Sequence, residues 1–131
     1  MRYILDTNTL IYFFKGLGNV AQTLLRKSPT EIGIPAIVLF ELEVGIAKST
    51  APQKRRNQLY EITSVIQIIP FDEKDAKITA SIRVDLEKKG TPIGPYDLLI
   101  GGTALAHQAT LITHNTKEFG RIQKLQIEDW Y

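Results

Sequence analysis

Short apolar runs alternate along this chain with segments long enough to form helices, and this alternation limits the possible folds more than any other feature. The runs lie at Tyr3–Leu5, Ile32–Ile34, Ile68–Ile69, Leu111–Ile112 and Leu125–Ile127. Runs with few or no polar positions are typical of strands buried on both faces, as in a parallel sheet. The alternation therefore predicts an α/β sandwich built around a central, mainly parallel sheet of about four to five short strands.

The segments between these runs carry helix signals. Expected helices lie at residues 10–14, 20–25, 36–48, around 59–66, from 73 to the residue before Gly90, and at 96–107. Gly16 and Gly90 suit the left-handed conformation that ends a helix, and Pro35 can begin one because its missing N–H has no helical partner there. Asp72 is positioned to cap the helix that follows it.

The composition is that of an ordinary globular chain and narrows the function only a little. Its 131 residues suit a single domain over 1–131, and the net charge of +2 is too small to indicate nucleic-acid binding by itself. With no cysteine, the chain has no disulfide or thiolate site. No segment resembles a signal peptide or an apolar membrane span, so we expect a cytoplasmic protein with no membrane contact.

Two oxygen-bearing side chains directly follow expected strands. Asp6 stops the first strand, and Asn115 comes a step or two after the strand at Leu111–Ile112. A helix N-cap would by itself account for Asp6. In open α/β sheets, however, ligands bind outside the carboxyl ends of the strands, where both residues are expected to lie.

Glu41 occupies an unusual place on its helix. At three- and four-residue spacing it shares a face with Ile37, Val38, Val44 and Gly45. An acid on an apolar face is unfavourable by several kcal/mol unless it is paired or binds a metal. The alternative is that this face is only half-buried and Glu41 reaches solvent.

Asp97 lies in the first turn of its expected helix, where an acid also complements the helix dipole. Gly101 and Gly102 follow, and their small size would let this helix approach the sheet closely and bring Asp97 near Asp6. Oxygen ligands without histidine or cysteine suit hard ions such as Mg²⁺ or Mn²⁺. Two such ions can activate a water and stabilise the leaving oxygen in phosphodiester hydrolysis.

Four ordered motifs resemble PIN-domain ribonucleases, and more narrowly the VapC-type toxins of toxin–antitoxin pairs. They read LDTNTLIYFF, IPAIVLFELEVGI, GTPIGPYDLLIGGTALA and LITHNTKEFGRI, followed by IEDW. The resemblance spans nearly the whole chain and implies a three-layer PIN-like sandwich. It also implies that Asp6, Glu41 and Asp97 are catalytic metal ligands for Mg²⁺ or Mn²⁺. Asn115 matches a fourth catalytic position that is often Asp, and it would orient water or a bound ligand.

The resemblance further implies an endoribonuclease that cleaves structured RNA of the tRNA or rRNA class and leaves 5′-phosphate and 3′-hydroxyl ends. A VapB-like antitoxin would block the acidic cleft, and the toxin would form a homodimer. Alternatives are a PIN-fold nuclease acting on other RNA or DNA outside such a pair, and a non-catalytic RNA- or protein-binding module. A phosphatase with Asp6 as nucleophile is a further alternative, but it would leave Glu41 unexplained.

Weaker signals point to substrate contacts. Thr7 and Thr113 could hydrogen-bond phosphate or the ligand carboxylates, although hydroxyls at strand ends often serve only as caps. The stretch from Lys48 to Arg56 carries four positive charges and no acid, and its Lys54, Arg55 and Arg56 are candidate contacts to an RNA backbone. A partner interface and a solvated loop are the alternatives for this stretch.

Overall fold

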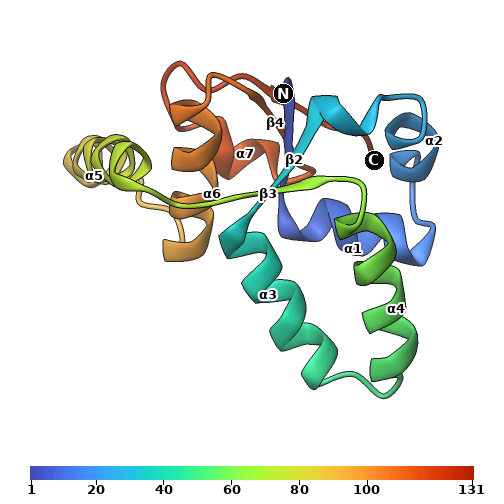
Figure 1. The fold of residues 1–131 in the computed structure, drawn as a ribbon. Helices are drawn as coiled ribbons and strands as arrows, with labels where there is room; N and C mark the ends of the chain where they lie inside the picture. The colour runs from blue at the N-terminus through green and yellow to red at the C-terminus, as the bar shows by residue number, and fades with distance from the viewer.

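The computed structural model describes all residues 1–131, and its element order follows the predicted alternation (Figure 1). The strands are β1 Tyr3–Leu5, β2 Ile32–Pro35, β3 Gln67–Ile69, β4 Thr110–Ile112 and β5 Ile127–Glu128. The helices are α1 Thr7–Lys15, α2 Val20–Leu24, α3 Ala36–Ala47, α4 Pro52–Thr63, α5 Glu73–Lys88, α6 Pro95–Ala106 and α7 Thr116–Phe119, with a 3₁₀ turn at Pro29–Glu31. The predicted α/β fold is confirmed.

All five strands pair in parallel in the order β3-β2-β1-β4-β5, which places β1 at the centre of the sheet. Tyr3, Ile4 and Leu5 are buried on both faces, as their uniformly apolar character predicts. Because the strands are parallel, their carboxyl ends lie along one edge. The segments that follow β1, β2, β4 and β5 therefore all leave the sheet from this edge, which we call the carboxyl edge.

Helices cover both faces of the sheet (Figure 1). Helices α1 and α2 lie on one side and α5 and α6 on the other, whereas α3 and α4 extend beyond the carboxyl edge as a pair. Gly16 ends α1 in the left-handed conformation at φ 68°, and Asp72 forms a capping box with Asp75 at the start of α5. No helix combines the length and the apolar character that a membrane crossing needs.

The buried face of α3 differs in part from the predicted one. Its buried residues are Val38, Leu42 and Ile46, which repeat every four residues. Val44 and Gly45, expected on an apolar face with Glu41, are exposed. Glu41 therefore lies on the flank of the buried stripe and is half-buried, because α3 covers the sheet only with its first turns before it extends past the edge.

Two further expectations are corrected. Helix α6 does pack on β4, but Gly102 faces α5: a Cβ at this position would lie 2.8 Å from the Cβ of Thr79 in α5. Gly101 faces the Ile122 side chain, with 2.6 Å between a built Cβ and Cδ1. Lys54, Arg55 and Arg56 do not lie in a loop, because α4 already begins at Pro52 and its first turns contain them.

Candidate active site

Asp6 lies at the carboxyl end of the central strand and also begins α1. Its Oδ1 accepts a hydrogen bond of 2.9 Å from the backbone N–H of Thr9, so it is the N-cap of that helix. The residue is only 5% exposed. Burial raises the pKa of Asp6 above its ordinary value, and hydrogen bonds from Thr113 and Thr9 offset this only in part. Asp6 thus does cap α1, the alternative that its sequence position left open, and its carboxylate is nevertheless held in a poorly solvated place.

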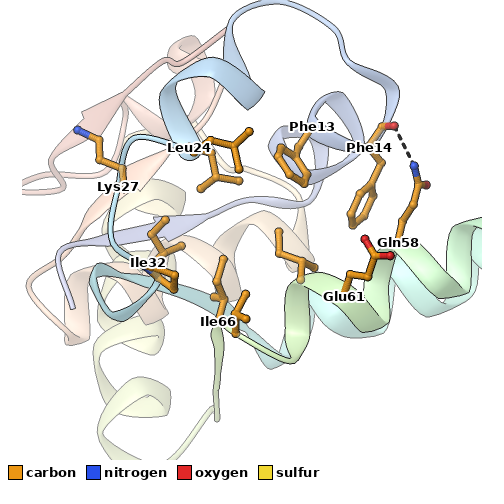
Figure 2. Close-up of a pocket in the computed structure, with 12 residues that line it drawn as sticks. Phe13, Phe14, Leu24, Lys27, Ile32, Gln58, Glu61 and Ile66 are labelled. Atoms are coloured by element: carbon orange, nitrogen blue, oxygen red, sulfur yellow. Dashed lines mark hydrogen bonds between the residues drawn. The ribbon is translucent and has the colours of Figure 1, made fainter.

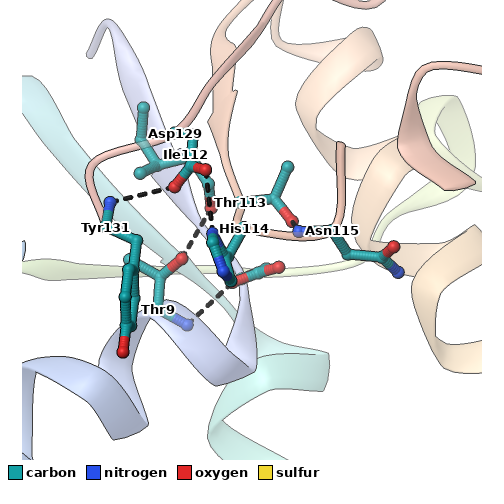
Figure 3. A network of polar contacts seen from close by, with 8 residues as sticks. Thr9, Ile112, Thr113, His114, Asn115, Asp129 and Tyr131 are labelled. Carbon is teal, nitrogen blue, oxygen red and sulfur yellow. Dashed lines mark hydrogen bonds and ion pairs between the residues drawn. The ribbon is translucent and has the colours of Figure 1, made fainter. Parts of the chain in front are cut away.

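The end of β4 brings Thr113 and Asn115 to the same edge (Figure 3). Thr113 is fully buried, and its Oγ1 accepts a 2.9 Å hydrogen bond from the backbone N–H of Asn115. Because the Thr113 hydroxyl also acts on Asp6, this residue links the ends of β1 and β4 inside the protein. Asn115 precedes α7 without capping it, and its half-buried side chain makes no hydrogen bond.

Glu41 reaches this edge from α3. Its Oε1 accepts a 2.6 Å hydrogen bond from the Thr7 hydroxyl, which lies in the first turn of α1 directly after Asp6. A half-buried acid on the flank of α3 thereby obtains a neutral partner instead of a cation. The hydrogen bond fixes the position of the carboxylate without neutralising its charge.

Asp97 lies in the first turn of α6, and its environment shows that the acids converge. Burial, followed by the negative charges of Asp6, Glu118 and Glu41, raises the pKa of Asp97 to about 6. Every charge that acts on it is negative. Asp6, directly before α1, and three carboxylates from α3, α6 and α7 thus share one region at the carboxyl edge, and none of these four acids forms an ion pair.

The donor set of this cluster fits a hard divalent cation. Its candidate ligands are carboxylate oxygens, the chemistry that Mg²⁺ and Mn²⁺ prefer, and Asn115 follows β4 at the same edge. The side chains are not arranged as a finished ion site: nowhere do three His, Cys, Asp or Glu residues lie close enough to hold a metal as they stand. An ion would have to draw the carboxylates together.

Three residues near the site were given little or no role from the sequence. Glu118 in α7 raises the pKa of Asp97 through its charge. Asp129, which directly follows β5, raises the pKa of Asp6 through its charge. Its Oδ2 lies 2.8 Å from Nδ1 of His114, and the His114 ring stacks on Tyr131 (Figure 3).

A sequence signal existed for both acids. Asp129 follows a strand in the way that Asp6 does, and Glu118 lies one helical turn after Asn115.

The basic residues of α4 have different surroundings. Nη1 of Arg56 lies 3.3 Å from Oε2 of Glu43, whereas Lys54 is exposed and has no acidic partner. Arg55 is half-buried and lines a groove of about 350 Å³ between α1, α3 and α4. Glu41 lines the same groove, so the structure connects one of the three basic residues with the acidic cluster.

A second groove lies apart from the acidic cluster. This groove of about 520 Å³ is mostly apolar and runs between α1, α2 and α4 (Figure 2). Phe13, Phe14, Leu24 and Ile66 line it, and Glu61 is its only acid. It contains none of the residues that converge at the carboxyl edge, so we assign it no part in catalysis.

Residues 3–125 match the family described as PIN domain. The chain is 40% identical to Ribonuclease VapC2 of Rickettsia felis over 133 residues, which cover 99% of this chain and 98% of the relative. It is 35% identical to the tRNA(fMet)-specific endonuclease VapC of Salmonella typhimurium over 130 residues, with the same coverage of both chains. A crystal structure of VapBC2 from Rickettsia felis bound to a promoter DNA fragment superposes with a TM-score of 0.92, at 38% identity over the whole of both chains.

Proposed function

Because the chain belongs to the PIN domain family, and within it to the VapC proteins, we propose that it is a metal-dependent endoribonuclease and the toxin of a toxin–antitoxin pair. The observation that carries this proposal is the convergence of Asp6, Glu41, Asp97 and Glu118 without a compensating cation. Uncompensated carboxylates repel an RNA phosphate, and a divalent ion removes this conflict.

The residues have separable roles in the proposed reaction. Asp6, Glu41 and Asp97 would hold Mg²⁺ or Mn²⁺, and Asn115, whose amide has no partner in the protein, would orient the attacking water or the phosphate. When bound, the ion would supply charge stabilisation to the phosphodiester and a water activated for attack.

The neighbouring threonines support this arrangement. The backbone N–H of Thr9 and the Thr113 hydroxyl fix Asp6, and the Thr7 hydroxyl fixes Glu41. We therefore assign Thr7 and Thr113 to positioning the carboxylates, the second of the two roles that their sequence positions allowed.

The substrate and partners are inferred from the relatives. One relative is described as a tRNA(fMet)-specific endonuclease, which favours structured RNA of the tRNA class and leaves rRNA as the second candidate. Solved relatives are VapBC complexes, which favours a VapB-like antitoxin for this chain. We also propose that the chain is a single domain, that it forms a homodimer and that it acts in the cytoplasm. Light scattering on the purified protein would test the dimer.

Cleavage by purified protein tests the proposed activity. The protein would be incubated with bulk tRNA, rRNA and single-stranded DNA in Mg²⁺, in Mn²⁺ and in EDTA, with Asp6→Asn as the control. We expect defined RNA fragments with 5′-phosphate ends only when a divalent ion is present, and none from the variant. Cleavage in EDTA, or equal cleavage by Asp6→Asn, would contradict the assignment, and cleavage of DNA alone would favour the alternative nuclease.

A further inference from the structure

One acid, Glu41, and two cations, Lys15 and Arg55, line the groove between α1, α3 and α4. Glu41 and Gly45, one turn apart on α3, line this groove, and so do Ser49 and Thr50, which follow the end of that helix. Lys15, the last residue of α1, lines the groove from the facing helix.

Arg55 is held in place without being neutralised. Its Nη1 donates a 2.9 Å hydrogen bond to Oε1 of Gln58. Nε2 of Gln58 in turn donates to the backbone oxygen of Phe14 at 3.2 Å (Figure 2). This relay ties the Arg55 side chain to α1 through neutral groups only, so the guanidinium keeps its full charge. Its neighbour Arg56 instead pairs with Glu43, and this pair lies outside the groove.

Lys15 is the second cation without an acidic partner in the groove. No carboxylate lies within ion-pair distance of its Nζ, and the same is true of Arg55. The hydroxyls of Ser49 and Thr50 line the groove beside them. Two unpaired positive charges with hydroxyl donors beside them match the chemistry of a phosphate, not that of an apolar or a positively charged ligand.

Gly45 keeps the passage between the two ends open. A Cβ built at this position would meet no atom within 4 Å, so no packing contact requires a glycine there. Glycine also destabilises the interior of a helix, and alanine at this position would stabilise α3. The absence of a side chain one turn after Glu41 leaves room for a ligand between the acidic cluster and Arg55.

We propose that this groove is a subsite for the RNA strand. Arg55 and Lys15 hold a backbone phosphate next to the one that is cleaved, and Gly45 leaves the groove open between this phosphate and Glu41. The inference deepens the proposed ribonuclease function and rests on it. It assigns the substrate contact to Arg55 and not to Arg56, and it makes the contact independent of base identity.

Kinetics on a tRNA that the wild-type protein cleaves test the subsite. We expect Arg55→Gln to lower kcat/KM by about tenfold, the usual effect of losing a charge-assisted hydrogen bond. The loss should lie mainly in KM, and kcat at saturating RNA should stay within about twofold of the wild type. The salt dependence of log(kcat/KM) should flatten by about 0.7, one counterion on a single strand. Arg56→Gln is the matched control and should change neither quantity.

A second variant tests the floor of the groove without removing a charge. Gly45→Leu fills the open space, should not lower the unfolding temperature, and should raise KM, whereas Gly45→Ala should remain close to wild type. Equal effects of Arg55→Gln and Arg56→Gln, or wild-type kinetics of Gly45→Leu, would overturn the subsite while the ribonuclease assignment stands. Loss of binding to a copurified antitoxin with unchanged RNA kinetics would also overturn it. A wild-type protein that cleaves no RNA would reject both proposals.

Discussion

Asp6 combines two demands on one carboxylate. Capping α1 favours the charged form, because the N–H of Thr9 and the helix N-terminus stabilise a negative charge. Burial and the charge of Asp129 oppose ionisation, and the net result is a raised pKa of Asp6. The helix cap and the proposed ligand role are therefore compatible, since the cap positions the carboxylate and an added cation would stabilise its ionised form.

Replacing Glu41 tests whether its charge is needed. Glu41→Gln keeps the size of the side chain and an acceptor for the Thr7 hydroxyl, so α3 and its packing should persist. A neutral amide holds a hard cation poorly, and we expect RNA cleavage to fall by at least about 100-fold. Glu43→Gln, an exposed position two residues away, should keep activity within about twofold. Cleavage rates together with circular dichroism measure both effects; near-wild-type activity of Glu41→Gln would remove Glu41 from the site.

Asp97 predicts a pH dependence of stability in the absence of divalent ions. Its pKa of about 6 in the folded protein lies above the ordinary 3.8, so the folded state binds more protons between these values. Stability must then fall as pH rises from about 4 to 6. A fully buried group with this pKa would contribute about 3 kcal/mol, and solvent around the half-exposed Asp97 reduces our expectation to about 1 kcal/mol.

Urea unfolding in EDTA at pH 4.5 and 7.0 measures this contribution. Asp97→Asn should lose less stability than the wild type between the two pH values, and at pH 7.0 it should be the more stable protein. An identical pH dependence in both proteins would show that Asp97 is not in the environment that the structure gives it.

At the scale of elements, the position of Asp97 depends on how α6 packs. Gly102 allows α6 to lie against Thr79 of α5, and Ala104 is fully buried two residues later. The Thr79 hydroxyl is buried there without a hydrogen-bond partner, which indicates how little space remains between the two helices. The contact between α5 and α6 therefore sets where the first turn of α6 presents its acid.

Replacing glycine by alanine at two positions distinguishes the effect of this close helix packing from the effect of helix propensity. Gly102→Ala places a Cβ 2.8 Å from the Cβ and 3.2 Å from the Cα of Thr79, and a backbone atom cannot move aside as a side chain can. We expect a loss of about 1–3 kcal/mol in the free energy of unfolding. Gly45→Ala meets open space and should gain about 0.5–1 kcal/mol. Denaturant unfolding of both variants gives the comparison, and a stabilised Gly102→Ala would contradict the close packing.

At the scale of the whole molecule, the fold gathers negative charge that distant segments supply. Asp6 follows β1, whereas Glu41, Asp97 and Glu118 come from three different helices, so the repulsion among these acids opposes the folded state as a whole. An ion bound only by the folded protein stabilises it by mass action. The acidic cluster thus links folding stability to divalent ions.

Thermal unfolding with and without ions measures this link. Mg²⁺ or Mn²⁺ at millimolar concentration should raise the melting temperature of the wild type by several degrees, and that of Asp6→Asn/Asp97→Asn much less. A monovalent salt of equal ionic strength serves as the control for general screening. Equal shifts in both proteins would remove the claim of a metal site.

The sequence by itself determined the type and order of the elements and the edge where Asp6, Asn115 and Asp97 gather. Apolar runs, caps such as Asp72 and stops such as Gly16 act between residues close in the chain, so they can be read locally. Only the tertiary structure decided that the charge of Glu118 acts on Asp97 and that of Asp129 on Asp6. It also decided that Gly102 faces α5. The same holds for Arg55, which has no acidic partner, and for Arg56, which pairs with Glu43. These facts depend on helix packing and on contacts between side chains far apart in sequence, and no local pattern encodes which partners will meet.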